Sequence, residues 1–259
     1  MREYCYRTAG MCIYVDTYAP VVDPTSTTGA FSTGMSADGT HITAKGARAR
    51  GRAIANTLAP FFPGVIATLP SSAAESWSID NTSKQVVQNP MMLGTGGTTP
   101  AGTCAANWTI GAESGSATIT GTAGISRTDG IGSNQRVVIS AASSGALVNI
   151  RQTNFQSRVA IGDTIYGVGS IKLSGMSDVT YVRPSVEVVI DGTGYSISTF
   201  FASTTTYDQT DFELSFMTPE FLLAGTTISN LSYYVRVGFG TSGTGAATLE
   251  LGRAGIYKY

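Results

Sequence analysis

The stretch TIYGVGSIKLSGMSDVTYVRPSVEVVI, residues 164–190, decides the fold class of this chain. It contains two runs rich in Val, Ile, Tyr and Thr, separated by a short stretch of Ser, Gly and Asp, which is typical of consecutive strands joined by a turn. In the second run, Val186, Val188 and Ile190 occupy alternate positions and are expected to share one face of a strand. Glu187 then lies on the opposite face. The pattern predicts strands that bury one face.

The same pattern recurs from about residue 89 to the end of the chain. About ten runs of this kind are separated by clusters of Gly, Asp, Asn or Thr. They cover residues 107–111, 116–121, 135–140, 146–152, 164–173, 179–190, 195–201, 212–217, 231–239 and 247–259. Because no helical pattern lies between them, they predict an all-β domain folded as a sandwich or a barrel.

The composition restricts the classes of partner. Of the 259 residues, 42% are hydrophobic and 13% are charged, about half of the usual charged fraction near 25%. The surface must therefore be covered largely by Ser, Thr, Asn, Gln and Gly. The net charge is −1, which lacks the basic excess that binding to a phosphate backbone needs. Nucleic acid is therefore a poor candidate partner.

The sequence shows no sign of a membrane span, a leader or a metal site. No apolar run reaches the ~20 residues of a membrane helix, and residues 1–16 lack the apolar stretch of a signal peptide. We expect a soluble protein that does not insert into membranes and is not exported by the usual route. The cysteines are Cys5, Cys12 and Cys104. Their spacing fits neither a disulfide framework nor a zinc site, and His41 is the only histidine, which excludes a site with several His ligands. Asp208 and Asp211 are two nearby carboxylates, too few to indicate a cation site. We therefore expect no cofactor.

Residues 1–64 follow an α/β pattern instead. Met11–Val15 predicts a short buried strand, and Thr43–Leu58 predicts a helix. The helix carries a stripe at i, i+4, i+7 and i+11 that consists of Ala47, Gly51, Ile54 and Leu58. One strand and one helix bury too little surface to be stable alone, so other subunits are expected to cover them. Residues 65–84 are expected to form a linker, whose Trp77 packs against a neighbouring chain or domain.

A short motif precedes the predicted helix: Asp38 and His41, three residues apart, followed by ITAKGARARGR. With the preceding strand, residues 1–62 resemble the last conserved block of SGNH/GDSL hydrolases. The resemblance implies that Asp38 orients His41, which would take the proton of a serine hydroxyl as general base. The family's G-D-S nucleophile block and its oxyanion-hole blocks do not occur in this sequence. We therefore expect no esterase activity from the chain alone: the pair is a vestigial turn, or it is completed by another chain.

Residues 85–259 resemble a different kind of domain. Asn89 and Pro90, then a loop, then Trp108 before the next strand resemble the opening of jelly-roll carbohydrate-binding modules, and LELGRAGIYKY resembles their last strand. Similar modules follow SGNH domains in bacteriophage tail and fibre proteins. The expected fold is therefore mainly β, a jelly-roll β-sandwich preceded by a small truncated SGNH-like α/β segment.

Aromatic side chains are the candidates for a sugar site, because sugars stack on aromatic faces and are oriented by a few polar groups. The candidates are Trp108, Tyr181, Tyr195 and Tyr207. The alternative for each is packing in the core or at its rim. Tyr207 lies in the polar run TTTYDQTD, which favours exposure.

These resemblances imply a non-catalytic bacteriophage virion protein, such as a tail, fibre or head-decoration protein, assembled in the host cytoplasm. It would bind host surface polysaccharide or another virion protein, and serve in host recognition. The low charge and the uncovered N-terminal segment predict a homo-oligomer, and the resemblance to fibres implies a trimer. The alternatives are the C-terminal part of an SGNH acylesterase that acts on surface polysaccharide, and a structural adaptor without a ligand.

Overall fold

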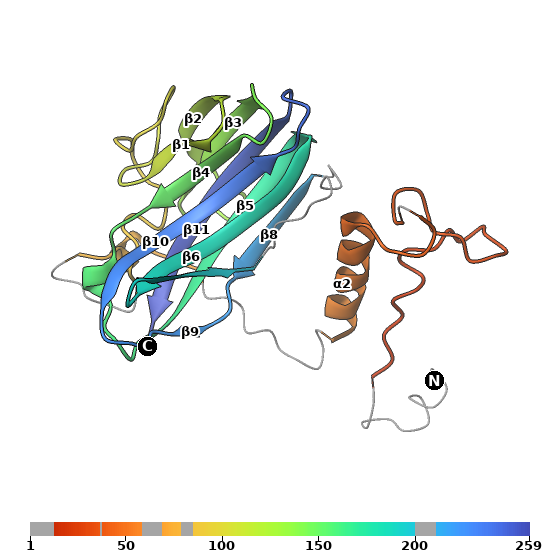
Figure 1. Ribbon diagram of the computed structural model, residues 1–259, viewed down its shortest axis with the longest axis horizontal. Coiled ribbons are helices and arrows are strands. Elements are labelled where there is room, and N and C mark those ends of the chain that lie inside the picture. The colour runs from red at the N-terminus through yellow and green to blue at the C-terminus, as the bar shows by residue number, and fades with distance from the viewer. Residues whose placement is uncertain (1–12, 37, 59–68, 79–84, 200–210) are drawn as a thin grey trace. The chain divides into compact units, whose positions relative to one another are not determined.

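The computed structural model describes residues 13–36, 38–58, 69–78, 85–199 and 211–259. The chain divides into two compact units, residues 1–66 and residues 67–259. Figure 1 shows the second unit as two layers of strands, and the first as a helix with irregular chain beside it.

Every strand described in unit 67–259 belongs to one of two antiparallel sheets. The five-stranded sheet has the order β1-β4-β10-β6-β7. Its strands are β1 (Thr109–Ser114), β4 (Leu147–Gln152), β10 (Ile228–Phe239), β6 (Val179–Ile190) and β7 (Thr193–Ser198). The six-stranded sheet has the order β2-β3-β11-β5-β8, and β9 pairs with β5. Its strands are β2 (Ala117–Ser126), β3 (Ser133–Ala141), β11 (Ala246–Lys258), β5 (Thr164–Ser177), β8 (Phe212–Met217) and β9 (Phe221–Leu222).

The order of the strands is that of a jelly-roll β-sandwich. Consecutive strands repeatedly cross from one sheet to the other, as between β3 and β4, β4 and β5, β5 and β6, and β10 and β11. Each predicted run contains a strand, so the prediction of an all-β sandwich is confirmed. The prediction missed β9, because a two-residue strand has no alternation to recognise. Two short 3-10 helices, η1 (Ala73–Glu75) and η2 (Gln156–Arg158), complete the described elements of this unit.

The core lies between the two sheets. The inward residues of β10 are Leu231, Tyr233, Val235, Val237 and Phe239, all buried. On β6, Val186, Val188 and Ile190 are buried, whereas Glu187 is half-buried on the other side. The predicted alternation is therefore confirmed, and the residues between these positions form the outward face of the sheet.

Residues 69–78, which were expected to be part of a linker, pack on the sandwich instead. The Glu75 Oε2 atom accepts a hydrogen bond of 2.7 Å from the hydroxyl of Tyr257. The Trp77 ring lies with its centroid 3.9 Å from the guanidinium carbon of Arg158. Trp77 thus packs against the β domain of its own chain, and this stretch is part of that domain.

Arg253 joins residues 69–70 to the six-stranded sheet through hydrogen bonds. The register of β11 shifts between Gly252 and Gly255, and Arg253 there has φ 48°. Its Nε and Nη2 atoms donate to the carbonyl oxygens of Pro70 at 2.7 Å and Leu69 at 3.1 Å. A positive φ costs a non-glycine residue about 1–2 kcal/mol, and bulges commonly redirect a side chain. The bulge directs this guanidinium toward residues 69–70.

In unit 1–66 the predicted helix is confirmed as α2 (Ala44–Leu58). Thr43 precedes it, and its Oγ1 atom accepts a hydrogen bond of 3.2 Å from Gly46 N. Gly46 is buried, and a Cβ atom at this position would lie 2.4 Å from the carbonyl oxygen of Met35. The helix therefore rests closely on the loop that precedes it. Among the described residues, no helix is long and apolar enough to cross a membrane.

The strand predicted over Met11–Val15 is not found where the chain is described. Residues 11–12 lie outside the described part, and residues 13–15 have no regular secondary structure. A strand needs a neighbouring strand to satisfy its backbone groups, and residues 13–15 form no β-bridge in the described part of the chain. Ile54 of the predicted helix stripe is 39% exposed, so the described part of the unit leaves this stripe uncovered.

Candidate functional site

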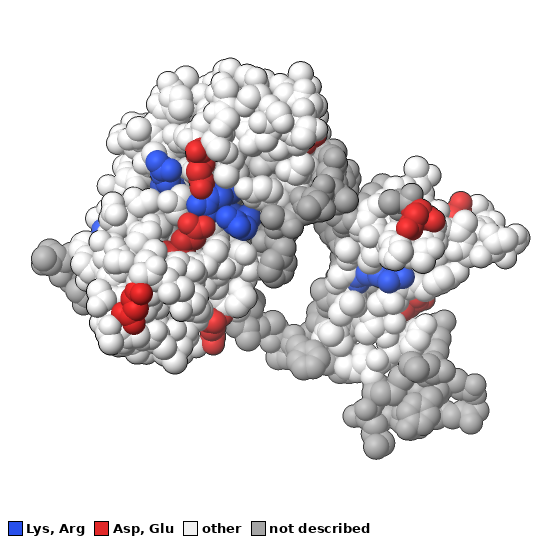
Figure 2. Space-filling model, in the orientation of Figure 1, with Lys and Arg blue, Asp and Glu red and all other residues white. Residues whose placement is uncertain are grey.

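The outward face of the five-stranded sheet carries a group of charged and aromatic side chains. The β10 residues that alternate with the core positions are Asn230, Ser232, Tyr234, Arg236 and Gly238. Arg236 pairs in register with Asn149 on β4 and Arg183 on β6, and Tyr234 pairs with Arg151 on β4. The register therefore brings these side chains onto one surface. Figure 2 shows charged atoms gathered in one group on this face of the sandwich, which is otherwise largely uncharged.

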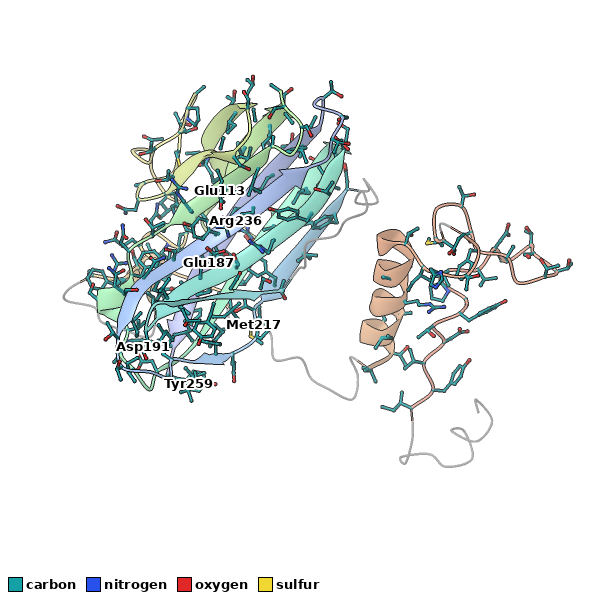
Figure 3. All side chains as sticks on the ribbon, in the orientation of Figure 1. Glu113, Glu187, Asp191, Met217, Arg236 and Tyr259 are labelled. Atoms are coloured by element: carbon teal, nitrogen blue, oxygen red, sulfur yellow. The ribbon has the colours of Figure 1, made fainter. Side chains whose placement is uncertain are left out.

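Arg236 is the centre of the group, and its side chain is only 5% exposed. Its Nε atom donates to Glu113 Oε2 at 2.6 Å, and its Nη2 atom donates to both Glu113 Oε1 and Glu187 Oε2 at 3.1 Å. Its Nη1 atom donates to Glu187 Oε1 and to Ser185 Oγ. All its N–H groups are thus engaged, with one glutamate on each side (Figure 3). Burial alone would lower the pKa of Arg236, but the bonds to both carboxylates outweigh it and raise that pKa.

A β-bulge places Glu113 beside Arg236. The register of β1 against β4 shifts between Ala112 and Ser114, so that Glu113 has no partner of its own and turns toward β10. Burial raises the pKa of Glu113, but hydrogen bonds from Arg236 and Asn149 lower it further than burial raises it. Glu113 is therefore ionised at neutral pH and acts as a hydrogen-bond acceptor.

Two buried polar atoms beside Arg236 have no hydrogen-bond partner: Asn149 Oδ1 and Arg183 Nε. Asn149 donates through Nδ2 to Glu113 Oε2 at 3.0 Å, which fixes the side chain. The Nη2 atom of Arg183 lies 3.8 Å from Glu187 Oε1, so this arginine is loosely paired. An unpartnered buried polar atom costs about 1–3 kcal/mol. Two of them on an outward face indicate a position for a ligand or for ordered water.

Two tyrosine rings lie beside the ionic group. The centroid of Tyr234 is 3.9 Å from the guanidinium carbon of Arg236, a cation–π contact. The ring of Tyr181 lies against Gly238, where a Cβ atom would come within 2.4 Å of it. Burial raises the pKa of Tyr181. The face therefore combines apolar rings with polar groups that are held in place by one arginine.

A shallow groove of about 490 Å³ lies at one end of β4 and β10. Its lining consists of Arg151, Thr153, Asn154, Ser229, Asn230, Ser232 and Tyr234. These residues are polar, and the charged one among them is Arg151. The groove shares Tyr234 with the ionic group, so the two form one continuous surface.

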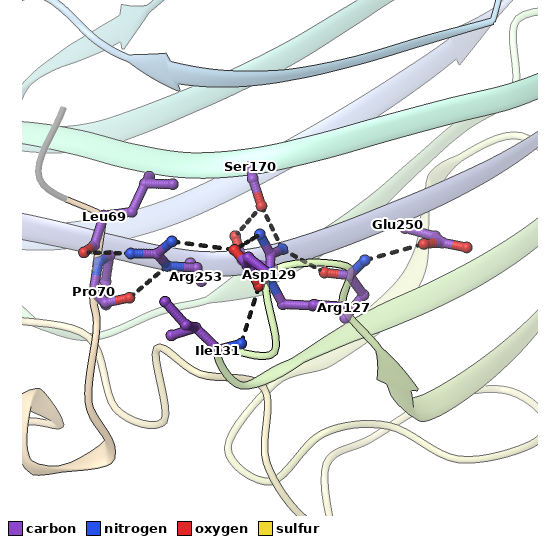
Figure 4. A network of polar contacts seen from close by, with 10 residues as sticks. Leu69, Pro70, Arg127, Asp129, Ile131, Ser170, Glu250 and Arg253 are labelled. Atoms are coloured by element: carbon purple, nitrogen blue, oxygen red, sulfur yellow. Dashed lines mark hydrogen bonds and ion pairs between the residues drawn. The ribbon is translucent and has the colours of Figure 1, made fainter. Parts of the chain in front are cut away.

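The six-stranded sheet carries a second network on its outward face (Figure 4). Arg127 donates to both carboxylate oxygens of Asp129 at 3.0 and 2.8 Å, and to Asn134 Oδ1 and Ser170 Oγ at 2.7 Å. Arg253 also donates to Asp129, at 3.2 Å. None of the described buried polar atoms that lack a partner belongs to this network. Its polar groups are therefore satisfied within the domain, and the network has a structural role.

The structure corrects the expected ligand role of Trp108. The residue is 1% exposed and lies in the core, where its ring meets Tyr233 edge-on at 5.7 Å. Its Nε1 atom donates to the carbonyl oxygen of Asn89 at 3.0 Å, and the Asn89 side chain in turn bonds the backbone of Leu93 and Ala106. The Asn89–Trp108 pattern therefore closes the first loop of the domain and presents no ring face to a ligand.

The other three aromatic candidates have different positions. Tyr181 lies on the outward face beside Arg236. Tyr195 is 40% exposed, but it pairs with the inward-facing Val188 and contacts Phe221 at 5.2 Å, at the open edge between the sheets. Tyr207 lies outside the described residues. The ligand roles of these tyrosines stay predictions.

The residues at the centre of the site, Glu113, Glu187 and Arg236, were missing from the prediction, and so were the surrounding Asn149, Arg151, Arg183 and Tyr234. The alternation of β10 is a usable signal, because the buried Tyr233 and Val235 place Tyr234 and Arg236 together on the other face. The bulge that turns Glu113 toward Arg236 has no comparable signal in the sequence. Among the described residues, no three His, Cys, Asp or Glu side chains are grouped so that they could hold a metal ion.

Asp38 and His41 form the contact that their spacing suggests. His41 Nδ1 lies 2.7 Å from Asp38 Oδ2, and Asp38 Oδ1 accepts the backbone N–H groups of His41 at 2.7 Å and Thr40 at 2.9 Å. These bonds, that from the His41 backbone first, lower the pKa of Asp38 well below its usual range. The bond to Asp38 raises the pKa of His41. The His41 side chain is 83% exposed, and its Nε2 atom has no partner in the described part of the chain.

No family model and no curated protein matches this sequence. Solved β-sandwich structures do resemble the chain. Carbohydrate-binding modules from the β-sandwich superfamily match 58% of this chain and 56% of their own, with 10% identity and a TM-score of 0.39. The CBM22-1 xylan-binding domain from Paenibacillus barcinonensis Xyn10C matches 63% of this chain and 89% of its own, with 15% identity and a TM-score of 0.36.

The enzymatically active domain of tailspike protein 4 from bacteriophage CBA120 matches 60% of this chain, with 12% identity and a TM-score of 0.35. This chain spans only 20% of that domain. At such identities and TM-scores, these similarities carry no information on ligand or activity.

Proposed function

We propose that the outward face of the five-stranded sheet binds a glycan, and that this chain is a non-catalytic glycan-binding protein. The observation that carries the proposal is the pair of buried unpartnered atoms, Asn149 Oδ1 and Arg183 Nε, which belong to the outward face of the sheet. The first accepts a hydrogen bond and the second donates one. A sugar hydroxyl does both, so the hydroxyls of a bound glycan can satisfy both atoms.

The rest of the face suits the same ligand. Sugars present C–H groups that pack on aromatic rings, and Tyr181 and Tyr234 lie on either side of Arg236 along the sheet. Arg236 does not itself have a free N–H group. Its part is to hold Glu113 and the surrounding side chains in place, so that the binding groups are ordered before a ligand arrives.

The two glutamates of the face suit binding rather than glycoside hydrolysis. Hydrolysis of a glycosidic bond needs one carboxylic acid whose pKa is raised enough to donate a proton. The pKa of Glu113 is lowered, and both Glu113 and Glu187 are bonded to the same guanidinium. A carboxyl group whose pKa is lowered by a bonded arginine is a poor proton donor.

A glycan array tests this function directly. The purified chain is applied to an array of bacterial surface polysaccharides and neutral plant glycans, and hits are measured by calorimetry. Asn149→Ala and Tyr234→Ala should each weaken binding about five- to thirtyfold, which corresponds to the loss of about one to two kcal/mol expected for a hydrogen bond or a stacked ring. Tyr166→Ala, an outward-facing tyrosine of the other sheet, is the matched control and should keep the affinity. Absence of any hit, or equal losses in all three variants, would refute the proposal.

The biological setting proposed for this function is a bacteriophage particle, as a tail, fibre or head-decoration protein that contacts host polysaccharide. It rests on the sequence resemblances of residues 1–62 and 85–259, and on the uncovered stripe of α2, which fits a trimer or another homo-oligomer. Antibodies against the chain should label purified phage particles, and light scattering should give three times the mass of one chain. A stable monomer at micromolar concentration would contradict the oligomer.

A second function, the C-terminal part of an SGNH acylesterase, is favoured by one observation. Asp38 holds His41 at 2.7 Å with the other imidazole nitrogen exposed, as an orienting acid and base require. No hydroxyl nucleophile meets that nitrogen within the described residues, so we expect the purified chain not to hydrolyse p-nitrophenyl acetate above background. Turnover that disappears in His41→Ala would contradict this expectation.

A further inference from the structure

The groove beside Tyr234 differs in charge from the ionic group around Arg236. Its lining contains Arg151 together with hydroxyl and amide side chains, and no carboxylate. Such a lining offers one full positive charge and many neutral hydrogen-bonding groups. A volume of about 490 Å³ falls within the range of pockets for small ligands.

Arg151 has donor capacity to spare. It forms no hydrogen bond and no ion pair with any residue in the described part of the chain. Its charge reaches Glu113 closely enough to lower the pKa of that carboxyl group, but the Glu113 oxygens already accept bonds from Arg236 and Asn149. The charge of Arg151 thus acts on Glu113, but the guanidinium forms no hydrogen bond with the described residues of the site.

The wider face has an excess of one positive charge. Three arginines, Arg151, Arg183 and Arg236, face the two carboxylates of Glu113 and Glu187. Arg236 is saturated by both carboxylates, so the two remaining arginines have no full carboxylate partner. In a chain whose charged fraction is only 13%, an uncompensated arginine in a polar groove needs a reason.

We propose that this groove binds an acidic sugar residue, whose carboxylate pairs with Arg151 while its hydroxyls bond the Ser and Asn side chains of the lining. The inference rests on the proposed glycan-binding function and specifies the class of glycan. A guanidinium and a carboxylate form two parallel hydrogen bonds in a fixed geometry. Tyr234, which lines both the groove and the ionic group, provides the apolar wall between the acidic sugar and the next sugar of the glycan.

Nucleic acid and other polyanions are weaker candidates for this groove. Binding to a phosphate backbone needs several cations in a row, whereas the groove has Arg151 alone among its lining residues. A single arginine surrounded by hydroxyl and amide groups fits one carboxylate on a polyhydroxylated ring.

The test uses the full chain and pairs of small sugars that differ only in charge. The probes are the methyl glycosides of glucuronic, galacturonic and N-acetylneuraminic acid, each compared with its methyl ester, and affinities are measured by NMR titration. At least one acid should bind at least tenfold more tightly than its ester. Arg151→Gln should abolish this preference. Lys172→Gln removes the same charge from the outward face of the other sheet and should leave the preference unchanged.

The outcomes separate this inference from the function on which it rests. Equal affinity for every acid and its ester, or an acid preference that survives Arg151→Gln, overturns the acidic specificity. If neutral sugars still bind in a manner that depends on Tyr234, the glycan-binding function stands and only the specificity falls. If neither these probes nor the polysaccharide array binds to the chain, both are overturned.

Discussion

The outward faces of the two sheets use the same chemistry for different ends. Each has a nearly buried arginine bonded to carboxylates: Arg127, 10% exposed, on the six-stranded sheet, and Arg236, 5% exposed, on the five-stranded sheet. Around Arg127 every bond is satisfied within the domain, and Arg253 continues the network to the carbonyl oxygens of residues 69–70. Around Arg236 the network stops short and leaves two buried polar atoms without partners.

One pair of asparagines shows the difference most clearly. Asn134 donates to Glu250 at 3.0 Å, and Asn149 donates to Glu113 at 3.0 Å. The Oδ1 atom of Asn134 accepts a bond from Arg127 at 2.7 Å, whereas the Oδ1 atom of Asn149 accepts none. An ionic network on a sheet face is therefore not in itself a sign of a binding site. The sign is an ordered polar atom that the fold positions and then leaves unsatisfied.

The largest effect is expected from removing the two central arginines. Arg236→Met removes the cation that is hydrogen-bonded to both Glu113 and Glu187 in a partly buried site and leaves only the loose pairing of Arg183 with Glu187, which should lower the free energy of unfolding by about 3 kcal/mol. Arg127→Met should cost only about 1 kcal/mol, because Asp129 keeps its bond to Arg253.

Urea denaturation followed by tryptophan fluorescence measures both arginine variants. The two tryptophans of the chain, Trp77 and Trp108, both lie in unit 67–259, so the signal reports the sandwich alone. Equal losses in the two variants, or a greater loss for Arg127→Met, would show that the networks do not differ in the way described.

The matched asparagines give the next effect and the sharpest contrast. Asn134→Ala removes the acceptor of a charged donor and should cost about 1–2 kcal/mol of stability. Asn149→Ala deletes an unsatisfied atom together with one bond, so its cost in stability should be below about 1 kcal/mol. Glycan affinity should fall in Asn149→Ala and stay unchanged in Asn134→Ala. The comparison of the two faces is wrong if both variants show the same profile of stability and affinity.

Much of the fold could be predicted from the sequence, because alternation is a local signal. The runs of Val, Ile and Tyr locate the long strands, and the same alternation assigns Tyr181 to the outward face. The ion pairs and the side-chain hydrogen bonds to the backbone could not be predicted, because they join distant segments: Arg236 meets Glu113 across 123 residues, and Arg253 reaches the carbonyl oxygen of Pro70 across 183. Trp108 shows the opposite error, since a residue pattern resembling a binding module proved to be part of the core.

The third prediction concerns the staple that Arg253 forms with residues 69–70. Arg253→Ala and Arg253→Gly both lose the bonds to Leu69 and Pro70, but only alanine keeps the unfavourable φ of 48°. Glycine adopts this conformation freely, so the glycine variant should be more stable than the alanine variant by about 1 kcal/mol. Thermal denaturation measures the difference, and glycan affinity should not change in either variant. An alanine variant that is the more stable of the two would contradict the strain assigned to this bulge.

The smallest effect is a loss of stability in acid that the two faces should share. The pKa values of Glu113 and Glu250 are both lowered: burial raises each, but bonds from Arg236 and Asn149 in one case, and from Arg136 and Asn134 in the other, outweigh it. A carboxyl group whose pKa is lower in the folded state stabilises the fold fully above its unfolded pKa, about 4.3. That contribution is lost as the pH falls through the folded value. Because Glu113 is about one-third exposed, water screens its charge, and its contribution to stability should be below about 1 kcal/mol.

Urea denaturation between pH 6 and pH 3 should show less loss of stability in Glu113→Gln and in Glu250→Gln than in the unmodified chain. If only Glu250→Gln flattens the profile, Glu113 is not held as an ion by Arg236, and the five-stranded face is less ordered than its geometry indicates.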